Sequence, residues 1–177
     1  TLKDGQKWPM RVLGSDPRLG VALLRPAPGA AITTMPRPLP LGDSAAVGAG
    51  TTVLVIANQA DSPGSVSLGL VAGVDKDCPW DPSLKGLMQI TARVGGAGSG
   101  GPVLNLRREV VGMVVATAGF GRFEGPTGVT GFPTIPAVGT QAGTFAIGIN
   151  DVKEILDELK AGKVISRPSL GAVVAPA

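Results

Sequence analysis

The stretch that decides the fold is Gly95-Gly96-Ala97-Gly98-Ser99-Gly100-Gly101-Pro102, in which one serine lies among five glycines before the apolar run Val103-Leu104-Asn105-Leu106. Glycine at this density lets the backbone adopt positive φ angles and approach other groups closely. A serine at the centre of such a turn is either a nucleophile beside an anion-holding set of N–H groups or an ordinary residue of a tight loop. Because glycine and serine are common turn residues, the octapeptide alone favours the ordinary loop.

The neighbouring residues exclude two other kinds of serine loop. A phosphate-binding P-loop needs a lysine, a hydroxyl residue and then a helix, whereas Pro102 and a strand-like pattern follow here. The nucleophile elbow of α/β-hydrolases needs a glycine two residues before the serine. That position is Ala97, and no helical pattern follows it.

The composition predicts an all-β architecture. The 177 residues are 44% hydrophobic and include 27 glycines and 16 prolines, which indicates many short segments separated by turns. Repeated Val, Leu and Ile runs supply apolar surface to bury and argue against disorder. This length suits one domain with a sizeable core or two small barrels that share an interface.

Charge and residue counts exclude several classes of function. The net charge is +3, but the basic residues are scattered and Arg107-Arg108 is the only adjacent pair, so no nucleic-acid partner is predicted. The single cysteine, Cys78, allows no internal disulfide. The chain has no histidine, which excludes His-based metal sites and any Ser–His or Cys–His pair within it. We therefore expect no metal and no cofactor.

The sequence shows no membrane-spanning or targeting segment. No apolar run approaches the ~20 residues that cross a bilayer. Residues 1–5 (TLKDG) do not resemble a signal peptide.

The first 40 residues predict two short strands and an extended connection. Strands are expected at 7–13 and 21–24, separated by a turn at 14–17. Residues 25–40 contain five prolines, which remove ladder donors and restrict φ, so this segment is expected to link two half-domains.

From residue 41 the pattern predicts the strands of a barrel. A loop is expected at 58–64 and a hairpin turn at 107–109. On β-branched and apolar content, the expected strands are 51–57, 65–74, 87–94, 103–106, 110–117 and 145–149.

Two longer loops interrupt these strands. Residues 75–86 carry Cys78 and Trp80, and we expect Trp80 to pack within its own domain because large aromatic residues are highly buried on average. A surface for a partner is the alternative for Trp80. Residues 118–144 are rich in Gly and Pro, and loops of this length are usually functional or mobile. We expect this loop to pack poorly against the barrel unless a partner covers it.

One helix is predicted near 151–161. Val152, Ile155, Leu156 and Leu159 recur at helical spacing. Asp151 and Glu154 have the spacing of a capping box, and Gly162 supplies the residue that ends the helix.

Several segments, in the same order along the chain, resemble the trypsin-like domain of the HtrA/Deg (DegP-like) serine protease family. Any one match is weak, but the ordered set runs from residue 4 to about 171 and leaves out only the insertions at 75–86 and 118–144. The matching segments are 14–24 (GSDPRLGVALL) to GxDPxxDLAVL, 39–44 to LPLGDS, 53–58 (VLVIAN) to VLAIGN, 67–72 (SLGLVA) to SGIVSA, 98–105 (GSGGPVLN) to GNSGGPLVN and 145–150 (FAIGIN) to FAIPIN.

The resemblance implies a chymotrypsin/trypsin-like double β-barrel with a C-terminal α-helix. Residues 1–40 would be the remnant of an incomplete N-terminal barrel plus the linker. Residues 41–165 would form the C-terminal barrel with the helix. Residues 166–177 would be an exit segment, and 167–171 look like the junction to a PDZ domain that is not present in this sequence.

The resemblance also assigns site residues. Ser99 would occupy the nucleophile position, and the N–H groups of Ala97 and Ser99 would form the oxyanion hole. Val115, Ala116 and Thr117 would wall the substrate pocket, and the loop at 118–144 would be its rim.

This chain departs from the family pattern at the catalytic positions. The family's histidine would lie upstream of Thr1, and the acid of the DLAVL motif falls on Gly20. Asp16 lies four residues earlier, in the wrong register to replace it. The glycine two residues before the serine is Ala97, and the residue before the serine is Gly98 in place of Asn or Asp. Because triad members act as a unit, loss of the base alone costs about 10⁶ in kcat.

Three functional hypotheses follow. The favoured one is a catalytically inactive pseudoprotease that binds unfolded or extended peptide segments, or a protein partner, as a scaffold or assembly module. The second is an active serine endopeptidase whose histidine lies upstream of residue 1, and the third is an unrelated β-barrel structural protein. The resemblance further implies an extracytoplasmic location, in the periplasm or at a membrane, and a possible homo-oligomer.

Overall fold

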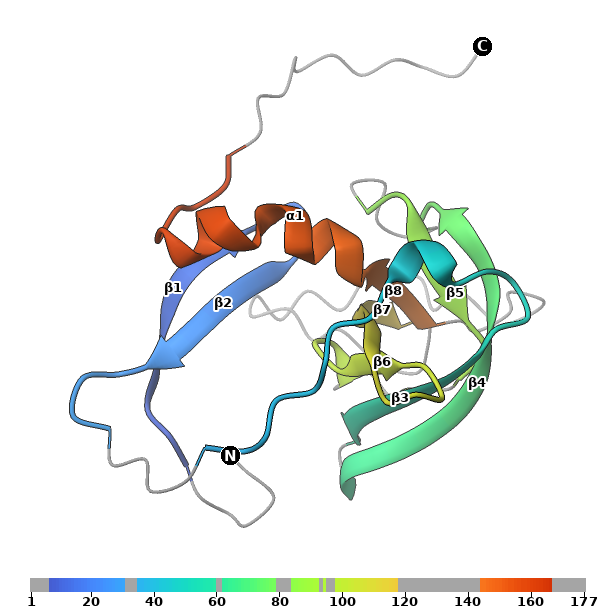
Figure 1. The fold of residues 1–177 in the computed structure, drawn as a ribbon, viewed down its shortest axis with the longest axis horizontal. Coiled ribbons are helices and arrows are strands. Elements are labelled where there is room, and N and C mark those ends of the chain that lie inside the picture. Colours follow the sequence, from blue (N-terminus) through green and yellow to red (C-terminus); the bar gives the residue numbers. More distant parts are fainter. Residues whose placement is uncertain are drawn as a thin grey trace, which may run out of the picture.

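A computed structural model of the chain describes residues 7–30, 35–59, 62–78, 84–92, 94, 98–117 and 144–166. These residues form a two-stranded antiparallel sheet, a closed six-stranded barrel and one helix (Figure 1). The prediction of an all-β chain with a C-terminal helix is confirmed. The elements are β1 (Met10–Asp16), β2 (Val21–Pro26), the 3₁₀ turn η1 (Ser44–Ala46), β3 (Thr52–Gln59), β4 (Ser62–Lys76), β5 (Leu87–Ile90), β6 (Pro102–Leu104), β7 (Val110–Thr117), β8 (Thr144–Gly148) and α1 (Ile149–Lys160).

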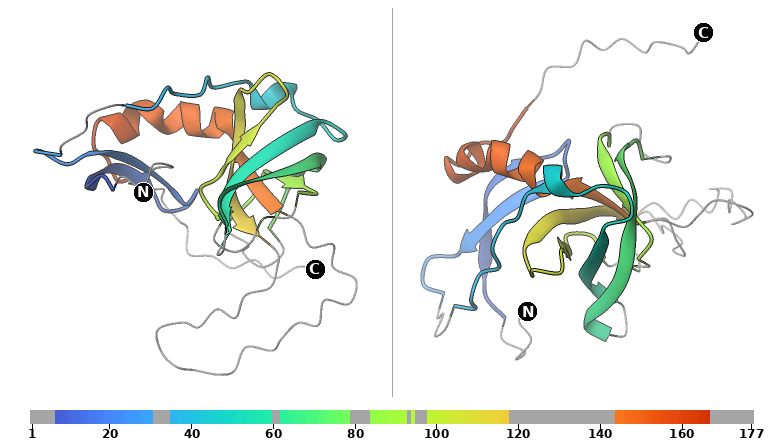
Figure 2. Two further views of the ribbon diagram at one scale, coloured as in Figure 1. Left: turned by 90° about the horizontal axis from the view of Figure 1, so that it is seen from below. Right: turned by 45° about the vertical axis from the view of Figure 1, so that its right-hand side comes forward.

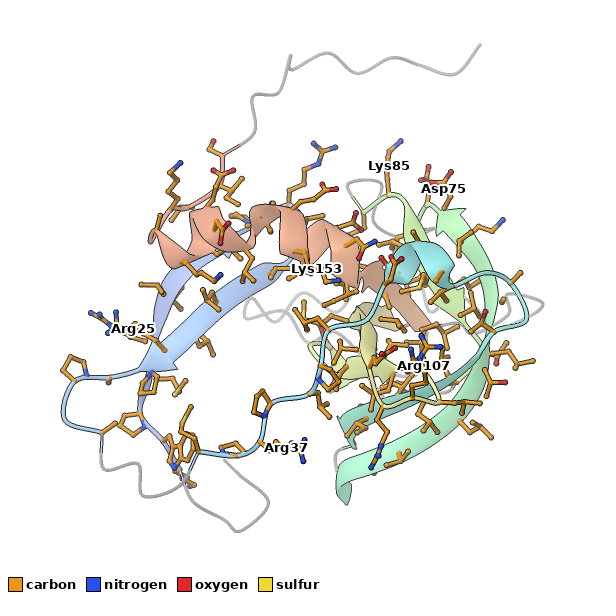
Figure 3. All side chains as sticks on the ribbon, in the orientation of Figure 1. Arg25, Arg37, Asp75, Lys85, Arg107 and Lys153 are labelled. Carbon is orange, nitrogen blue, oxygen red and sulfur yellow. The ribbon has the colours of Figure 1, made fainter. Side chains whose placement is uncertain are left out.

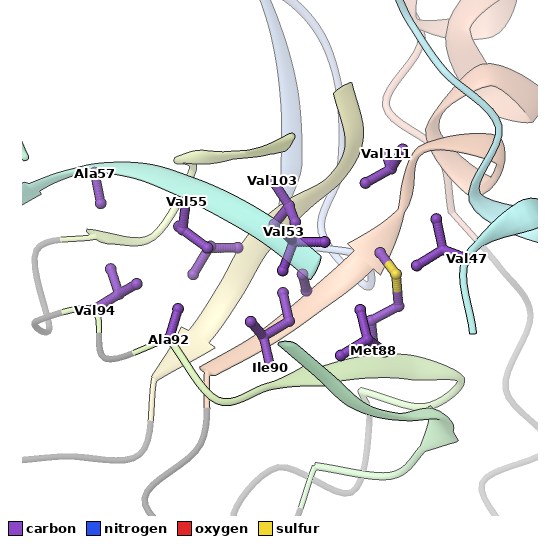
Figure 4. Close-up of a cluster of buried hydrophobic side chains, with 13 residues drawn as sticks. Val47, Val53, Val55, Ala57, Met88, Ile90, Ala92, Val94, Val103 and Val111 are labelled. Atoms are coloured by element: carbon purple, nitrogen blue, oxygen red, sulfur yellow. The ribbon is translucent and has the colours of Figure 1, made fainter. Parts of the chain in front are cut away.

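The barrel core consists of residues that alternate along the strands. All neighbouring strands are antiparallel, in the order β3-β4-β5-β8-β7-β6, and β6 pairs with β3 to close the barrel. Val53 and Val55 of β3 are fully buried inside, where they meet Ile90 of β5 and Val103 of β6 (Figure 4). Because side chains alternate between the two faces of a strand, β3 turns its other residues outward.

A second apolar cluster joins α1 and the β1–β2 hairpin to the outside of the barrel. Ile155 and Leu159 of α1 pack with Val21 of β2 and with Phe145 and Ile147 of β8. Figure 2 shows α1 and the hairpin together on one side of the molecule, away from β3 and β4. Cys78 is a buried free thiol in the same cluster.

The segment Leu41–Ser44, which follows the predicted linker, fastens the helix to the barrel. The Gly42 N–H donates to the Val110 carbonyl at 2.8 Å, which holds this segment along the start of β7. The Ser44 Oγ accepts the Asn150 N–H at 3.1 Å, and the Asp43 carboxylate accepts the Asn150 side-chain amide at 2.7 Å. Lys153 of α1 donates to the Gly42 carbonyl (Figure 3). The hydrogen bonds from Asn150 and from the Ala45 N–H hold the pKa of Asp43 below its ordinary value.

The capping box predicted at Asp151 and Glu154 is wrong. The helix begins at Ile149 after Gly148, which has no side chain to cap it, and Asp151 lies in the first turn. The cap comes instead from Ser44, about one hundred residues earlier in the chain. The predicted end is confirmed: Gly162 has φ +80°, and its N–H and that of Lys163 bond to the carbonyls of Leu159 and Glu158 as in a Schellman motif.

Several predicted boundaries differ from the structure. β1 continues through residues 14–16, where a turn was expected, and β3 and β4 extend into the predicted loop 58–64, where Gln59 pairs with Ser62. Thr144 belongs to β8, and its buried hydroxyl donates to the Ala92 carbonyl at 2.7 Å. Trp80 and residues 118–143 lie outside the described residues, so the expectations about them remain predictions.

In the described part of the chain, α1 is the one α-helix, and it is too short and too polar to cross a membrane.

Removal of the Ser44 hydroxyl should destabilise the fold more than removal of the Glu154 carboxylate. Ser44→Ala leaves the Asn150 N–H without its acceptor and should cost about 1 kcal/mol of unfolding free energy. Glu154→Ala should change it by a few tenths at most. Urea denaturation of the two variants measures both values, and a larger loss for Glu154→Ala would restore the capping box.

Asp43 should make part of the stability sensitive to acid. Its pKa is lowered in the folded chain, so its contribution is present above the ordinary value of 3.8 and is lost as the pH falls through the lower folded value. Asp43→Asn removes this ionisation. Its urea midpoint should therefore fall less steeply than that of the parent chain between about pH 5 and pH 2. Equal slopes would show that Asp43 does not contribute.

Candidate active site

Ser99 lies in a tight turn that comes just before β6 in the chain and contacts β3 and β7 in space. The turn runs from Gly98 to Gly101 and is closed by a hydrogen bond from the Gly101 N–H to the Gly98 carbonyl at 3.1 Å. The Gly100 N–H donates to the Val114 carbonyl at 2.7 Å, and the Gly101 carbonyl accepts the Val114 N–H at 2.9 Å. These bonds attach the turn to β7, so the position of Ser99 is set by main-chain contacts.

Each glycine of this turn is required for a different physical reason. A Cβ on Gly101 would overlap the Ile56 carbonyl oxygen, so β6 can begin beside β3 only with glycine there. Gly98 is buried against Val94 and Ala57 and has no room for a methyl group. Gly100 has open space around it, but its φ of +84° strains any residue with a Cβ.

The Ser99 hydroxyl is exposed and lies near a main-chain carbonyl. Its Oγ is 3.5 Å from the Val115 carbonyl oxygen, which is longer than an ordinary O–H···O hydrogen bond. A carbonyl oxygen can accept a hydrogen bond but cannot serve as a general base. The chain has no histidine.

One edge of β7 next to Ser99 has no strand paired to it among the described residues. β6 pairs with β7 only as far as Met113. The next residue of β7, Val114, hydrogen-bonds to the Gly98–Gly101 turn instead. Beyond that point, among the described residues, β7 pairs only with β8, and a bulge at Val115 lies between Val114 and Ala116. The bulge turns the Val115 carbonyl toward Ser99, because an extra residue changes the direction of the main-chain groups.

A cleft of about 310 Å³ lies against the Ser99 turn. Its lining residues are Ile56, Ala57, Gly98, Ser99, Gly100, Gly101 and Pro102. None of these lining residues has an ionisable side chain. The site is therefore a main-chain surface with an apolar wall.

The structure places the other predicted site residues as follows. Val115 directs its half-buried side chain toward the cluster around α1 and only its main chain toward Ser99. Ala116 and Thr117 continue β7, with side chains outside the described residues, and Ala97 lies outside them entirely. The roles of these residues in a pocket and an oxyanion hole remain predictions.

Gly20 lies in the turn between β1 and β2. Its φ is +66°, and a Cβ built on it would meet no atom within 4 Å. The turn is held by Asp16, a fully buried carboxylate whose Oδ1 accepts the N–H groups of Arg18 and Leu19 at 2.9 and 3.1 Å. We did not predict this role for Asp16. The Asp-Pro dipeptide could have indicated it, because an Asp side chain often accepts N–H groups of the turn that it begins.

The model of the trypsin-like peptidase domain family matches residues 1–113. The chain belongs to this family. The sequence motifs resemble the HtrA/DegP group of trypsin-like proteases, and the relatives confirm that this domain is HtrA/DegP-like. The chain is 27% identical over 182 residues to serine protease PepD of Mycobacterium tuberculosis and 30% identical over 180 residues to a probable periplasmic DegP-like serine endoprotease of Rickettsia prowazekii. These matches cover 98% of this chain but only 36% and 30% of those proteins, so the chain spans about a third of their length.

Two solved structures share the fold. The HtrA-type protease AlgW, solved with a decapeptide, superimposes with a TM-score of 0.70 at 21% identity, covering 92% of this chain and 44% of AlgW. Deg5 superimposes with a TM-score of 0.60, covering 88% of this chain and 63% of Deg5. The HtrA-like domain therefore has the trypsin-like architecture that the sequence motifs predicted.

A methyl group on Gly101 should loosen the closure of this HtrA-like barrel. Gly101→Ala places Cβ against the Ile56 carbonyl oxygen and should cost about 1–3 kcal/mol of unfolding free energy, the usual range for overpacking. Gly48→Ala is the matched control, because its Cβ meets no atom within 4 Å. Urea denaturation should give a midpoint close to that of the parent chain for Gly48→Ala. Equal losses in the two variants would show that β6 can shift to accommodate the methyl group.

Proposed function

We propose that this HtrA-like domain binds extended polypeptide segments at the Ser99 cleft and does not cleave them. The observation that carries the proposal is the environment of Ser99: its Oγ lies 3.5 Å from the main-chain carbonyl oxygen of Val115, in a chain without histidine. A serine hydroxyl becomes a nucleophile when a base within hydrogen-bond reach takes its proton and a third group orients that base.

The position of the family's acid supports the same conclusion. By resemblance this position is Gly20, which has no side chain to orient an imidazole. Asp16, the nearest carboxylate in the sequence, accepts the N–H groups of its own turn. A histidine from outside these 177 residues would therefore lack its usual partner.

The binding part of the proposal rests on main-chain groups. An extended peptide can add to β7 beyond Val114, at the edge that the described residues leave unpaired, because a strand edge offers N–H and C=O groups to a second chain. The Val115 carbonyl and the Gly98–Gly101 turn lie at this edge, next to the 310 Å³ cleft. AlgW has been solved with a decapeptide and with a tripeptide, which supports peptides as the class of ligand.

The cellular setting is part of the proposal. Relatives described as periplasmic endoproteases support an extracytoplasmic location. There, a peptide-binding HtrA-like domain without hydrolytic activity would act as a scaffold or an assembly partner, alone or as a homo-oligomer.

Purified chain should not hydrolyse casein, and an active-site phosphonate should not label Ser99. Loss of the base costs about 10⁶ in kcat, so any residual signal should fall to background. Ser99→Ala should leave that background unchanged, and mass spectrometry of phosphonate-treated protein checks the labelling directly. Rapid stoichiometric labelling at Ser99 would overturn the proposal and show that a base reaches Ser99 from elsewhere.

An uncharged eight-residue peptide with a fluorescent label should bind the same protein. Filling the cleft with Ser99→Trp should weaken binding about tenfold, a loss near 1.4 kcal/mol, whereas Ser99→Ala should not change it. Fluorescence anisotropy measures both. Undiminished binding to Ser99→Trp would place the peptide outside the cleft.

A further inference from the structure

A row of exposed apolar side chains runs along the outer face of β4. Val66, Leu68 and Leu70 occupy alternate positions and are 61%, 68% and 46% exposed. Leu54 and Ile56 of β3 share this face, because Ile56 pairs with Val66 and Leu54 pairs with Leu68. We call these five residues the β4 stripe.

The β4 stripe is unusual for a surface. Single exposed apolar residues are normal, but contiguous apolar patches on soluble proteins mark interaction sites. Charged residues commonly protect exposed strands from unwanted association, and residues 62–74 contain none. The described elements that pack on the barrel exterior, α1 and the β1–β2 hairpin, lie on the other side (Figure 2).

The stripe is continuous with the Ser99 cleft. Ile56 lines the cleft and also belongs to the stripe, where it pairs with Val66. From Val66 the stripe continues over four residues of β4 to Leu70, a distance of about 13 Å at the rise of an antiparallel strand. A polypeptide held at Ser99 can therefore reach the stripe without leaving the protein surface.

We propose that the β4 stripe is a second binding subsite, occupied by an uncharged aliphatic stretch of the same polypeptide that enters the Ser99 cleft. This inference rests on the proposed function. The shared residue Ile56 selects this occupant, because a segment tethered in the cleft is present at a high effective concentration over the adjoining surface. The absence of charged side chains along 62–74 favours an uncharged, apolar ligand, since a charged group would lose hydration there without gaining a partner.

The test compares three labelled peptides: the eight-residue cleft peptide, the same peptide extended by eight residues with Val and Leu at alternate positions, and one extended by Ser and Gln. The parent chain should bind the apolar extension about tenfold more tightly than the polar one, because additional apolar surface is buried. Leu68→Lys should remove this difference and leave the affinity for the cleft peptide unchanged. Leu106→Lys is the matched control, since Leu106 is 69% exposed and lies outside the stripe. It should behave like the parent chain.

A second measurement does not depend on a charge change. A fluorophore on Leu68→Cys should be quenched by a tryptophan in the apolar extension, whereas one on Leu106→Cys should not; Cys78 is buried and should remain unlabelled. Equal affinity of Leu68→Lys and the parent chain for the apolar extension would overturn the subsite. Failure of the cleft peptide alone to bind, with the apolar extension still sensitive to Leu68→Lys, would reject the cleft and keep the stripe.

Two further outcomes would replace the proposed occupant. A dimer of the parent chain that becomes a monomer in Leu68→Lys, seen by analytical ultracentrifugation without any effect on peptide affinity, would assign the stripe to a second copy. Cosedimentation of the parent chain, but not of Leu68→Lys, with phosphatidylglycerol vesicles would assign it to lipid. Either result contradicts the polypeptide subsite.

Discussion

The closure of the barrel depends on the close approach of Gly101 to the main chain of β3. β6 is only three residues long and pairs with β3 at Val55 and Leu54, so it must begin immediately beside the Ile56 carbonyl. Any side chain at residue 101 would occupy the space of that carbonyl oxygen. The same turn bonds to Val114 of β7 and carries Ser99 at its surface. Barrel closure and the placement of Ser99 are thus consequences of one contact.

This constraint changes what the glycine-rich motif indicates. Gly98, Gly100 and Gly101 are each required by packing or by backbone conformation, without reference to catalysis. A chain can therefore keep the serine loop of a protease for the sake of its barrel. The chemistry of Ser99 depends instead on the groups around its hydroxyl: the Val115 carbonyl oxygen lies 3.5 Å away, and the chain contains no histidine.

The parts of the fold that depend on local patterns could be predicted from the sequence. Alternating Val and Ile residues gave the barrel strands, and Gly162 gave the end of the helix. The start of the helix could not be predicted, because its cap is the hydroxyl of Ser44, far away in the chain. The turn expected at 14–17 was wrong for the same reason, because Ser15 bonds to Lys163 and Ile165, which follow the distant helix. The loop expected at 58–64 was wrong for a local reason: Gln59 pairs with Ser62, so β3 and β4 extend into it. In the site, resemblance to the family indicated Ser99 and Val115, but the bulge that aims the Val115 carbonyl depends on pairing with β8.

Binding and catalysis make different demands on this site. A peptide-binding edge consists of main-chain N–H and C=O groups, which every residue carries, so substitutions that preserve the strands also preserve the edge. Catalysis depends on two or three particular side chains, and a single change at one of them, as we propose for glycine at residue 20, is enough to remove an orienting carboxylate. The β4 stripe resembles the binding edge in this respect, because its proposed function requires only aliphatic side chains that face outward at alternate positions. Under the proposed function, a trypsin-like domain without its catalytic groups would therefore keep the surfaces by which it holds a polypeptide.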